Sequence, residues 1–183
     1  CRGCWTRSDK WTTQEDSYNG TLQAGAEVPP AKLNDPSAYV RQGYIVGQLP
    51  SDALLWFPGD KATVRAYPLK IQAGIFAGKL VQQDGAWHIA DGTIAGRSKG
   101  EDLIEAFELL GFCDGHQYYG TMKLYVNNYL DILASGAVSE TATCDALSLG
   151  TGFTADEGSF STTPAQVAQS VCDRLAAAGV RSI

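Results

Sequence analysis

The chain has 183 residues, of which 44% are hydrophobic, 19% are charged and 10% are aromatic. These values are typical of a globular domain that buries about 70% of its unfolded surface, and they exclude a disordered chain. The net charge of -6 and the scattered basic residues exclude a nucleic-acid-binding surface, and no apolar run approaches the about 20 residues that span a membrane.

The chain predicts a single domain over residues 1–183, in which the N-terminal arm, residues 1–34, packs as a segment of its own. Trp11, Tyr18 and Leu22 recur at helical spacing and predict a helix in this arm. Beyond the arm, Asp35 followed by a proline is a helix-start signature, which predicts one or two helical turns through Gln42.

The middle of the chain predicts a sheet. Alternating apolar runs separated by glycine, proline and Asp-Gly turns predict strands at residues 44–46, 63–71, 74–81 and 86–90. The segments that begin at Gly74 and Gly92 share a glycine, an apolar residue, Ala-Gly and a base, which favours equivalent positions in one sheet.

Residues 50–59 predict a loop or a short edge element that carries a cluster of apolar side chains from Leu54 to Phe57. An exposed cluster of this kind is typical of an interaction site. Trp56 and Phe57 are therefore candidate binding residues, and a protein partner or a surface complex is the expected occupant.

The best-marked stretch is a strand that feeds a helix. Ser98 and Glu101 have the spacing of a capping box, and Gly111 predicts the helix end. Arg97 stands at the junction, where it either binds an anionic group or forms a buried ion pair. A second helix is predicted over residues 116–135, apolar on two faces and therefore sandwiched, and a third begins at Thr163.

These elements predict an α+β fold, a mostly antiparallel sheet with two to four packed helices, stapled by disulfides. The five cysteines predict an exported protein, since disulfides are rare in the cytosol. If Cys1 carries the lipid of a bacterial lipoprotein, the other four have three possible pairings, of which we expect Cys113 with Cys144 and Cys4 with Cys172. The alternative is that Cys1 only begins a truncated chain and carries nothing.

The motif DGTIAGR at residues 91–97, the helix ending at Cys113, the helix ending in LDIL and the segment CDALSLGTGF from Cys144 resemble uncharacterised exported proteins and lipoproteins of myxobacterial type. The similarity covers residues 67–155, about half of the chain. It implies export, a sheet with helices and a disulfide that joins the end of the first helix to the CDALSLG strand. It implies no activity.

Catalytic motifs are weak in this sequence. His116 stands two residues from Asp114 and His88 three from Asp91, which makes each pair a candidate for acid–base work or for a local turn. The C-x-x-C spacing of Cys1 and Cys4 lacks the histidine of a haem attachment site and a second ligand pair for zinc, so we expect no metal and no cofactor.

The sequence therefore favours a non-catalytic, exported surface-binding or assembly module of unknown ligand. The alternative is a small extracellular hydrolase that uses a His/Asp pair. The expected location is extracellular, periplasmic or anchored to the outer membrane, and contact with a membrane is expected only through a lipid anchor on Cys1.

Overall fold

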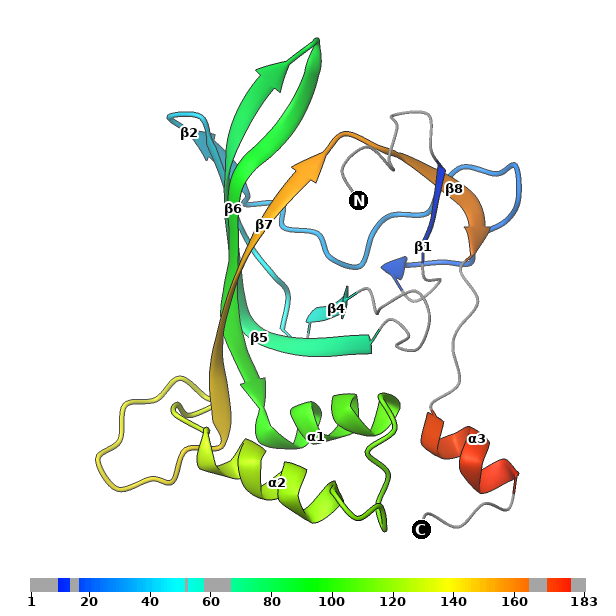
Figure 1. Cartoon of the computed structure of the whole chain (residues 1–183). Coiled ribbons are helices and arrows are strands. Elements are labelled where there is room, and N and C mark those ends of the chain that lie inside the picture. Colours follow the sequence, from blue (N-terminus) through cyan, green and yellow to red (C-terminus); the bar gives the residue numbers. More distant parts are fainter. Residues whose placement is uncertain (1–9, 14–16, 52, 58–66, 165–170, 179–183) are drawn as a thin grey trace. The chain divides into compact units, whose positions relative to one another are not determined.

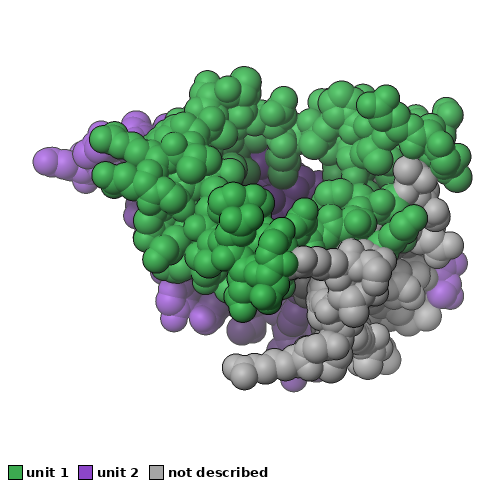
Figure 2. Space-filling model, turned by 90° about the horizontal axis from the view of Figure 1, so that it is seen from above, with its two compact units in different colours: residues 1–50, 75–94, 151–167 green, residues 51–74, 95–150, 168–183 purple. Residues whose placement is uncertain are grey.

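The computed structural model describes residues 10–13, 17–51, 53–57, 67–164 and 171–178. Within these residues the chain is an α+β protein whose larger sheet has antiparallel pairs between β2 and β3, β3 and β5, and β4 and β5, in agreement with the sequence-based prediction. Contacts divide the chain into two compact units (Figure 2). Unit 1 consists of residues 1–50, 75–94 and 151–167, and unit 2 of residues 51–74, 95–150 and 168–183.

The larger sheet has six strands in the order β2-β3-β5-β6-β7, with β4 also paired to β5 (Figure 1). Its strands are β2 (Tyr39–Arg41), β3 (Tyr44–Gln48), β4 (Ala53–Phe57), β5 (Tyr67–Gln83), β6 (Ala86–Lys99) and β7 (Ala146–Asp156). The ranges of β5, β6 and β7 extend over both units. A two-stranded parallel sheet in unit 1 pairs β1 (Lys10–Thr13) with β8 (Ser159–Pro164).

Two tight turns connect neighbouring strands of unit 1, one between β5 and β6 and one between β2 and β3. Asp84 and Gly85, between β5 and β6, have φ angles of 52° and 76°, the left-handed pair of a type I′ hairpin turn. Gln42 and Gly43, between β2 and β3, have φ angles of 51° and 80°. The Asp-Gly turn is the one the sequence predicts. The helical turns predicted through Gln42 are wrong, because Tyr39–Arg41 forms β2 and pairs with β3.

The N-terminal arm also differs from its prediction. The structure has β1 where the sequence predicts a helix, and Tyr18 forms an isolated bridge with Ala31. Tyr18 and Leu22 are buried. The apolar spacing therefore identifies the residues that are covered, and the poor helix propensity of the threonines around Trp11 decides in favour of a strand.

Helix α1 (Gly100–Leu109) ends as the sequence predicts. Gly111 has a φ of 106°, its N–H donates to the Glu108 carbonyl, and the Phe112 N–H donates to the Phe107 carbonyl at 3.2 Å. These two bonds make a Schellman motif, and the rings of Phe107 and Phe112 complete it with an edge contact at 5.9 Å between centroids.

The start of α1 differs from the prediction. The N-cap residue is Lys99, and no side chain caps the helix. Ser98 is the next-to-last residue of β6 and is fully buried, with an Oγ atom that has no hydrogen-bond partner among the described residues. The capping-box prediction is wrong because the strand continues past the serine, so its hydroxyl points into the packing instead of toward the first helical turn.

Helix α2 (Tyr119–Asn128) is half as long as predicted. Met122 and Val126 are buried, whereas Tyr125 and Tyr129 are 62% and 56% exposed and stack on each other. Beyond the helix, Ile132 pairs with Ala146 as an isolated antiparallel bridge. The helix is therefore covered on one side and not sandwiched, because the aromatic stripe belongs to tyrosines that keep their polar tips at the surface.

Helix α3 (Val171–Ala177) is short, and Thr163 and Pro164 belong to β8 instead of starting it. Cys172 on α3 forms a disulfide with Cys113, with 5.4 Å between their α-carbons. The predicted bond from Cys113 to Cys144 is wrong, and with it the predicted bond from Cys4 to Cys172. Cys144 is a free cysteine.

The helix length explains this error. The prediction required a helix of about 20 residues that runs back along α1 and returns the chain to Cys113. Because α2 stops at Asn128, the chain reaches the opposite end of α1, where the Gly100 N–H donates to the Asp145 carbonyl at 2.9 Å. Cys144 is therefore near the first residue of α1, and Cys113 follows the last.

Candidate functional site

The open face of unit 1 is formed by β2, β3 and the adjoining part of β5. The register places Tyr39 opposite Val46, Arg41 opposite Tyr44, and Tyr44 opposite Lys79. Residues directly opposite each other in neighbouring strands point to the same face. Arg41, Tyr44 and Lys79 therefore form one row across three strands, and we call this set the cationic row.

The cationic row is exposed. Tyr44 is 43% exposed and Tyr39, on the same face, 54% exposed. Ile75, opposite Gln48 on that face, is 49% exposed, and Arg41 and Lys79 are exposed as well. The face therefore combines aromatic, apolar and positively charged side chains in contact with solvent.

This surface is positively charged, whereas the whole chain has a net charge of -6. Residues 39–48 and 75–83 contain Arg41 and Lys79 and no aspartate or glutamate, although the chain has 20 acidic and 14 basic residues. The nearest acid before β2 is Asp35, whose carboxylate accepts hydrogen bonds from the Ser37 and Gln48 backbone N–H groups at 2.8 and 2.7 Å. These bonds hold Asp35 at the end of β3.

Local sequence explains why this face is open. On the other face of the same strands, the Phe76 ring lies against Gly47, and Ile89 lies against Gly78. These large side chains cover the two glycines, and a side chain at either glycine would collide with them. The alternation of a strand then leaves the tyrosines and the bases on the solvent side.

A second feature of unit 1 is a hollow of about 280 Å³ beside His88, lined by Leu80, Trp87, His88, Ile89, Ala155, Asp156 and Glu157. The His88 Nδ1 atom lies 2.7 Å from the Asp156 Oδ1 atom. Its Nε2 atom is buried and has no hydrogen-bond partner among the described residues. Trp87 is 55% exposed at the same place.

The partner of His88 is therefore Asp156 and not Asp91, as the sequence suggested. Residues three apart in a strand point to opposite faces, so the strand geometry itself separates His88 from Asp91. Asp156 comes from the end of β7, which pairs with β6. Sequence spacing alone could not reveal a partner that lies 68 residues away.

His116 has a packing role at the turn before α2. Its Nδ1 atom accepts a hydrogen bond from the Tyr118 N–H at 3.3 Å, and its ring lies between Phe112 and Tyr118. The described contacts of His116 are those of a side chain that fixes a turn, and they do not place Asp114 against it.

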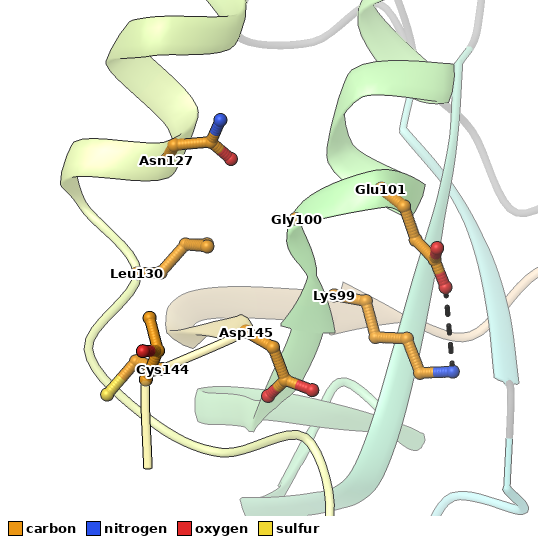
Figure 3. Close-up of a pocket in the computed structure, with 8 residues that line it drawn as sticks. Lys99, Gly100, Glu101, Asn127, Leu130, Cys144 and Asp145 are labelled. Atoms are coloured by element: carbon orange, nitrogen blue, oxygen red, sulfur yellow. Dashed lines mark ion pairs between the residues drawn. The ribbon is translucent and has the colours of Figure 1, made fainter. Parts of the chain in front are cut away.

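Unit 2 contains a larger pocket of about 440 Å³, which Figure 3 shows, lined by Lys99, Gly100, Glu101, Asn127, Leu130, Thr143, Cys144 and Asp145. Lys99 and Glu101 form an ion pair of 3.7 Å on one side. The sulfur of Cys144 points away from the Lys99 chain (Figure 3). The pocket thus brings a half-buried thiol near the start of α1 without a cation directed at it.

Arg97 does not form the ion pair that the sequence offered as one of two options, as far as the described residues go. Its half-buried guanidinium packs against the backbone of Gly136, which has a φ of 73° and ends the turn that begins at Leu133. A side chain at position 136 would collide with that guanidinium. Arg97 therefore supports the loop after α2.

Trp56 and Phe57 lie in β4, opposite Pro68 and Tyr67 of β5. Residues Ala53–Phe57 form a short strand, the second of the two predicted options, and β4 is paired with β5 along its whole length. Leu54 and Leu55 are half-buried. The placement of the Trp56 and Phe57 side chains lies outside what the structure describes, as do Cys1 and Cys4.

Asp131 fixes the segment between α2 and β7. Its carboxylate accepts hydrogen bonds from the Ser148 hydroxyl at 2.5 Å and the Ser148 N–H at 2.7 Å. These bonds lower the pKa of Asp131, with the hydroxyl bond as the largest cause. Asp131 is a structural acid of unit 2.

Within the described residues, no group of three histidine, cysteine, aspartate or glutamate side chains is placed to hold a metal ion. No described helix is long and apolar enough to cross a membrane. Comparison of the chain with protein-family models, curated proteins and solved structures finds no match.

Sequence reasoning missed Arg41, Tyr44, Lys79 and Asp156. The signal for the first three was the alternation of Tyr39 and Arg41 followed, after a glycine, by Tyr44. That alternation becomes informative only when the β2–β3 turn is known, since the register decides which side chains share a face.

Proposed function

We propose that this chain is a non-catalytic binding module of an exported protein, and that the open face of β2, β3 and β5 is its binding surface. The observation that carries the proposal is the cationic row, in which exposed Tyr44 stands directly between Arg41 and Lys79. Exposed aromatic and arginine side chains together are typical of recognition surfaces.

The disulfide supports the exported location. The disulfide joins Cys113, in the segment after α1, to Cys172 on α3, and so attaches the last described helix to the rest of unit 2. Structural disulfides persist in oxidising compartments and are rare in the cytosol. The resemblance to exported proteins of myxobacterial type points the same way. Lipidation of Cys1 stays a prediction from the odd number of cysteines.

The test is binding of the purified protein to a panel of immobilised neutral and acidic polysaccharides. We expect a specific ligand in the panel and loss of its binding in Tyr44→Ala. Tyr125→Ala, which removes an exposed tyrosine from α2, is the control and should bind as the wild type does. Equal loss in both variants, or no binding at all, would contradict the proposal.

A second candidate function is a small extracellular hydrolase centred on His88. The observation that favours it is the short contact between the His88 Nδ1 atom and Asp156, beside the hollow that His88 helps to line. A carboxylate that orients the imidazole in this way is typical of a general base. Hydrolysis of cell-wall or glycan substrates should disappear in His88→Ala and persist in His116→Ala, and activity that survives in His88→Ala excludes this candidate.

A protein partner along residues Leu54–Phe57 remains a further prediction. Pairing of β4 with β5 and the half-buried state of Leu54 and Leu55 reduce the apolar area left for such a partner. We place the binding function on the open face of unit 1, where Tyr39, Tyr44 and Ile75 are exposed.

A further inference from the structure

We infer that the ligand of the open face is a linear polysaccharide whose sugars carry carboxylate groups. This inference rests on the proposed binding function and names the chemistry of its ligand. The starting point is the order of the cationic row, which alternates base, aromatic ring and base across three adjacent strands.

The spacing of the row fits a polymer with repeated charges. Neighbouring strands lie about 4.8 Å apart, so the α-carbons of Arg41 and Lys79 are separated by about 10 Å with Tyr44 between them. Tyr39 is the diagonal neighbour of Tyr44 on the same face, about 7 to 8 Å away, and extends the aromatic surface. The face therefore has the ring of Tyr44 between two positive charges and the ring of Tyr39 beside it.

Each side chain type matches one part of such a ligand. A tyrosine ring has a negative face that attracts the positive C–H edge of a sugar ring. The guanidinium of Arg41 can hold a carboxylate with two parallel hydrogen bonds, and the ammonium of Lys79 supplies a point charge for the next one. The absence of acidic residues in strands β2 and β3 and in residues 75–83 removes repulsion from the same surface.

Other anionic ligands fit the face less well. A peptide that extends the sheet would run along the edge strand β2, whereas the cationic row crosses the strands. Nucleic acids and anionic lipids require larger basic clusters, about four to eight lysines and arginines for a lipid surface, and this face has two. A carboxylated polysaccharide needs only intermittent charges along a chain of rings.

The experiment measures binding of the full chain to polygalacturonate and to its methyl ester, which keeps the sugars and removes the charges. We expect the acid to bind and the ester to bind about tenfold more weakly or not at all, with affinity for the acid falling as salt is added. Arg41→Gln with Lys79→Gln should reduce affinity for the acid by about tenfold, the combined loss of two exposed charge contacts. Lys32→Gln, an exposed lysine of unit 1 outside the row, is the control and should change nothing.

The possible results separate this inference from the proposed function. One outcome is that a neutral polysaccharide or the methyl ester binds as tightly as the acid. If this binding is lost in Tyr44→Ala but unchanged in the double variant Arg41→Gln with Lys79→Gln, the binding function stands and the carboxylate inference is wrong. The inference is also wrong if single-stranded DNA, poly-glutamate or vesicles of anionic lipid bind more tightly than polygalacturonate. If nothing binds, both proposals fail. Thermal unfolding of each variant checks that the exposed substitutions leave the fold intact.

Discussion

At the scale of single residues, the strands of this protein depend on glycines that face larger neighbours. A β-carbon on Gly96 would collide with a methyl group of Ile71 and come within 3.1 Å of the Gln72 carbonyl oxygen. Gly120 on α2, by contrast, has no atom within 4 Å of that position. The space around the two α-carbons therefore differs.

Gly96→Ala should therefore destabilise the protein, and Gly120→Ala should not. We expect a loss of about 1 to 3 kcal/mol in the free energy of unfolding for the first, because neighbouring backbone must move. For the second we expect a gain of up to about 1 kcal/mol, the difference in helix propensity between the two residues. Urea denaturation of both variants measures the contrast, and equal effects would mean that β5 and β6 are not this close.

The disulfide between Cys113 and Cys172 should contribute to the stability of the fold. Replacing Cys113 and Cys172 by serine should lower the free energy of unfolding by about 4 kcal/mol, the chain-entropy value for a sequence separation of 59 residues. Cys144→Ser should change it little, because that thiol is free. Peptide mapping without reduction should recover Cys113 linked to Cys172, and a fragment that links Cys113 to Cys144 would contradict the structure.

Neither the cysteine pairing nor the cationic row could be predicted from the sequence, and one reason explains both. Both join residues whose distance depends on where a helix stops or on how strands align, and neither property follows from local spacing. Gly111 was predictable because a helix end is decided within a few residues. The same holds for the Asp84-Gly85 turn.

At the scale of elements, Lys70 of β5 forms ion pairs with helix α1. The Lys70 ammonium lies 2.9 Å from Asp102 and 3.0 Å from Glu105, one turn apart on the helix. The hydrogen bond to Asp102 is the largest cause that raises the pKa of Lys70, followed by the bond to Glu105. Two acids on one helical face thus share one base from the sheet.

Lys70→Met should lower the free energy of unfolding by at most about 1 kcal/mol, since the lysine side chain is 40% exposed and its ion pairs are partly screened. Because the pKa of Lys70 is raised in the folded state, its contribution is complete below the unfolded pKa of about 10.4 and is lost as pH rises through the folded value. Melting temperatures of wild type and variant should therefore converge only in strongly alkaline solution. Lys32→Met is the control, and a difference that disappears near neutral pH would contradict this assignment.

Element lengths were the least predictable property. The apolar stripe from Tyr118 to Leu133 is continuous in sequence, yet the helix stops at Asn128 and the remaining residues pair with the start of β7. The hydrogen bonds from Ala146 and Asp131 across this bridge compete with further helical turns. A pattern of apolar residues alone does not show that these bonds compete with the helix, so it could not predict where α2 ends.

At the scale of the whole molecule, the buried apolar residues are unequally divided. Among the described residues, unit 1 has Tyr18, Leu22 and Ala86, whereas unit 2 has Ala53, Ile71, Ala106, Cys113, Met122, Val126 and Ala146. Burial of apolar surface is the main stabilising contribution to folding. Unit 2 should therefore be the more stable of the two.

Hydrogen exchange measures this difference directly. Amides of β2 and β3 should exchange at a lower opening free energy than those of α1 and of the part of β5 that pairs with β4, because small apolar cores open first. As denaturant is added, the opening free energies of the two groups of amides should become equal only near global unfolding. Equal protection throughout, without denaturant, would mean that the division of the core has no consequence for stability.

The α+β class and the antiparallel sheet were predictable, since alternation and turn residues repeat along the chain. The division into two units was not, because the long strands β5, β6 and β7 contribute to both and their sequences show no boundary.

The bond between Cys113 and Cys172 has one more consequence, for the response of the chain to proteases. It closes a covalent ring that contains α2, β7 and β8, so a single cut by a protease anywhere inside the ring releases no fragment. The exposed segment from Ser135 to Thr143 lies within this ring. In a molecule cut once in that segment, the disulfide keeps the two pieces joined until it is reduced, so α3 stays attached to the rest of the chain.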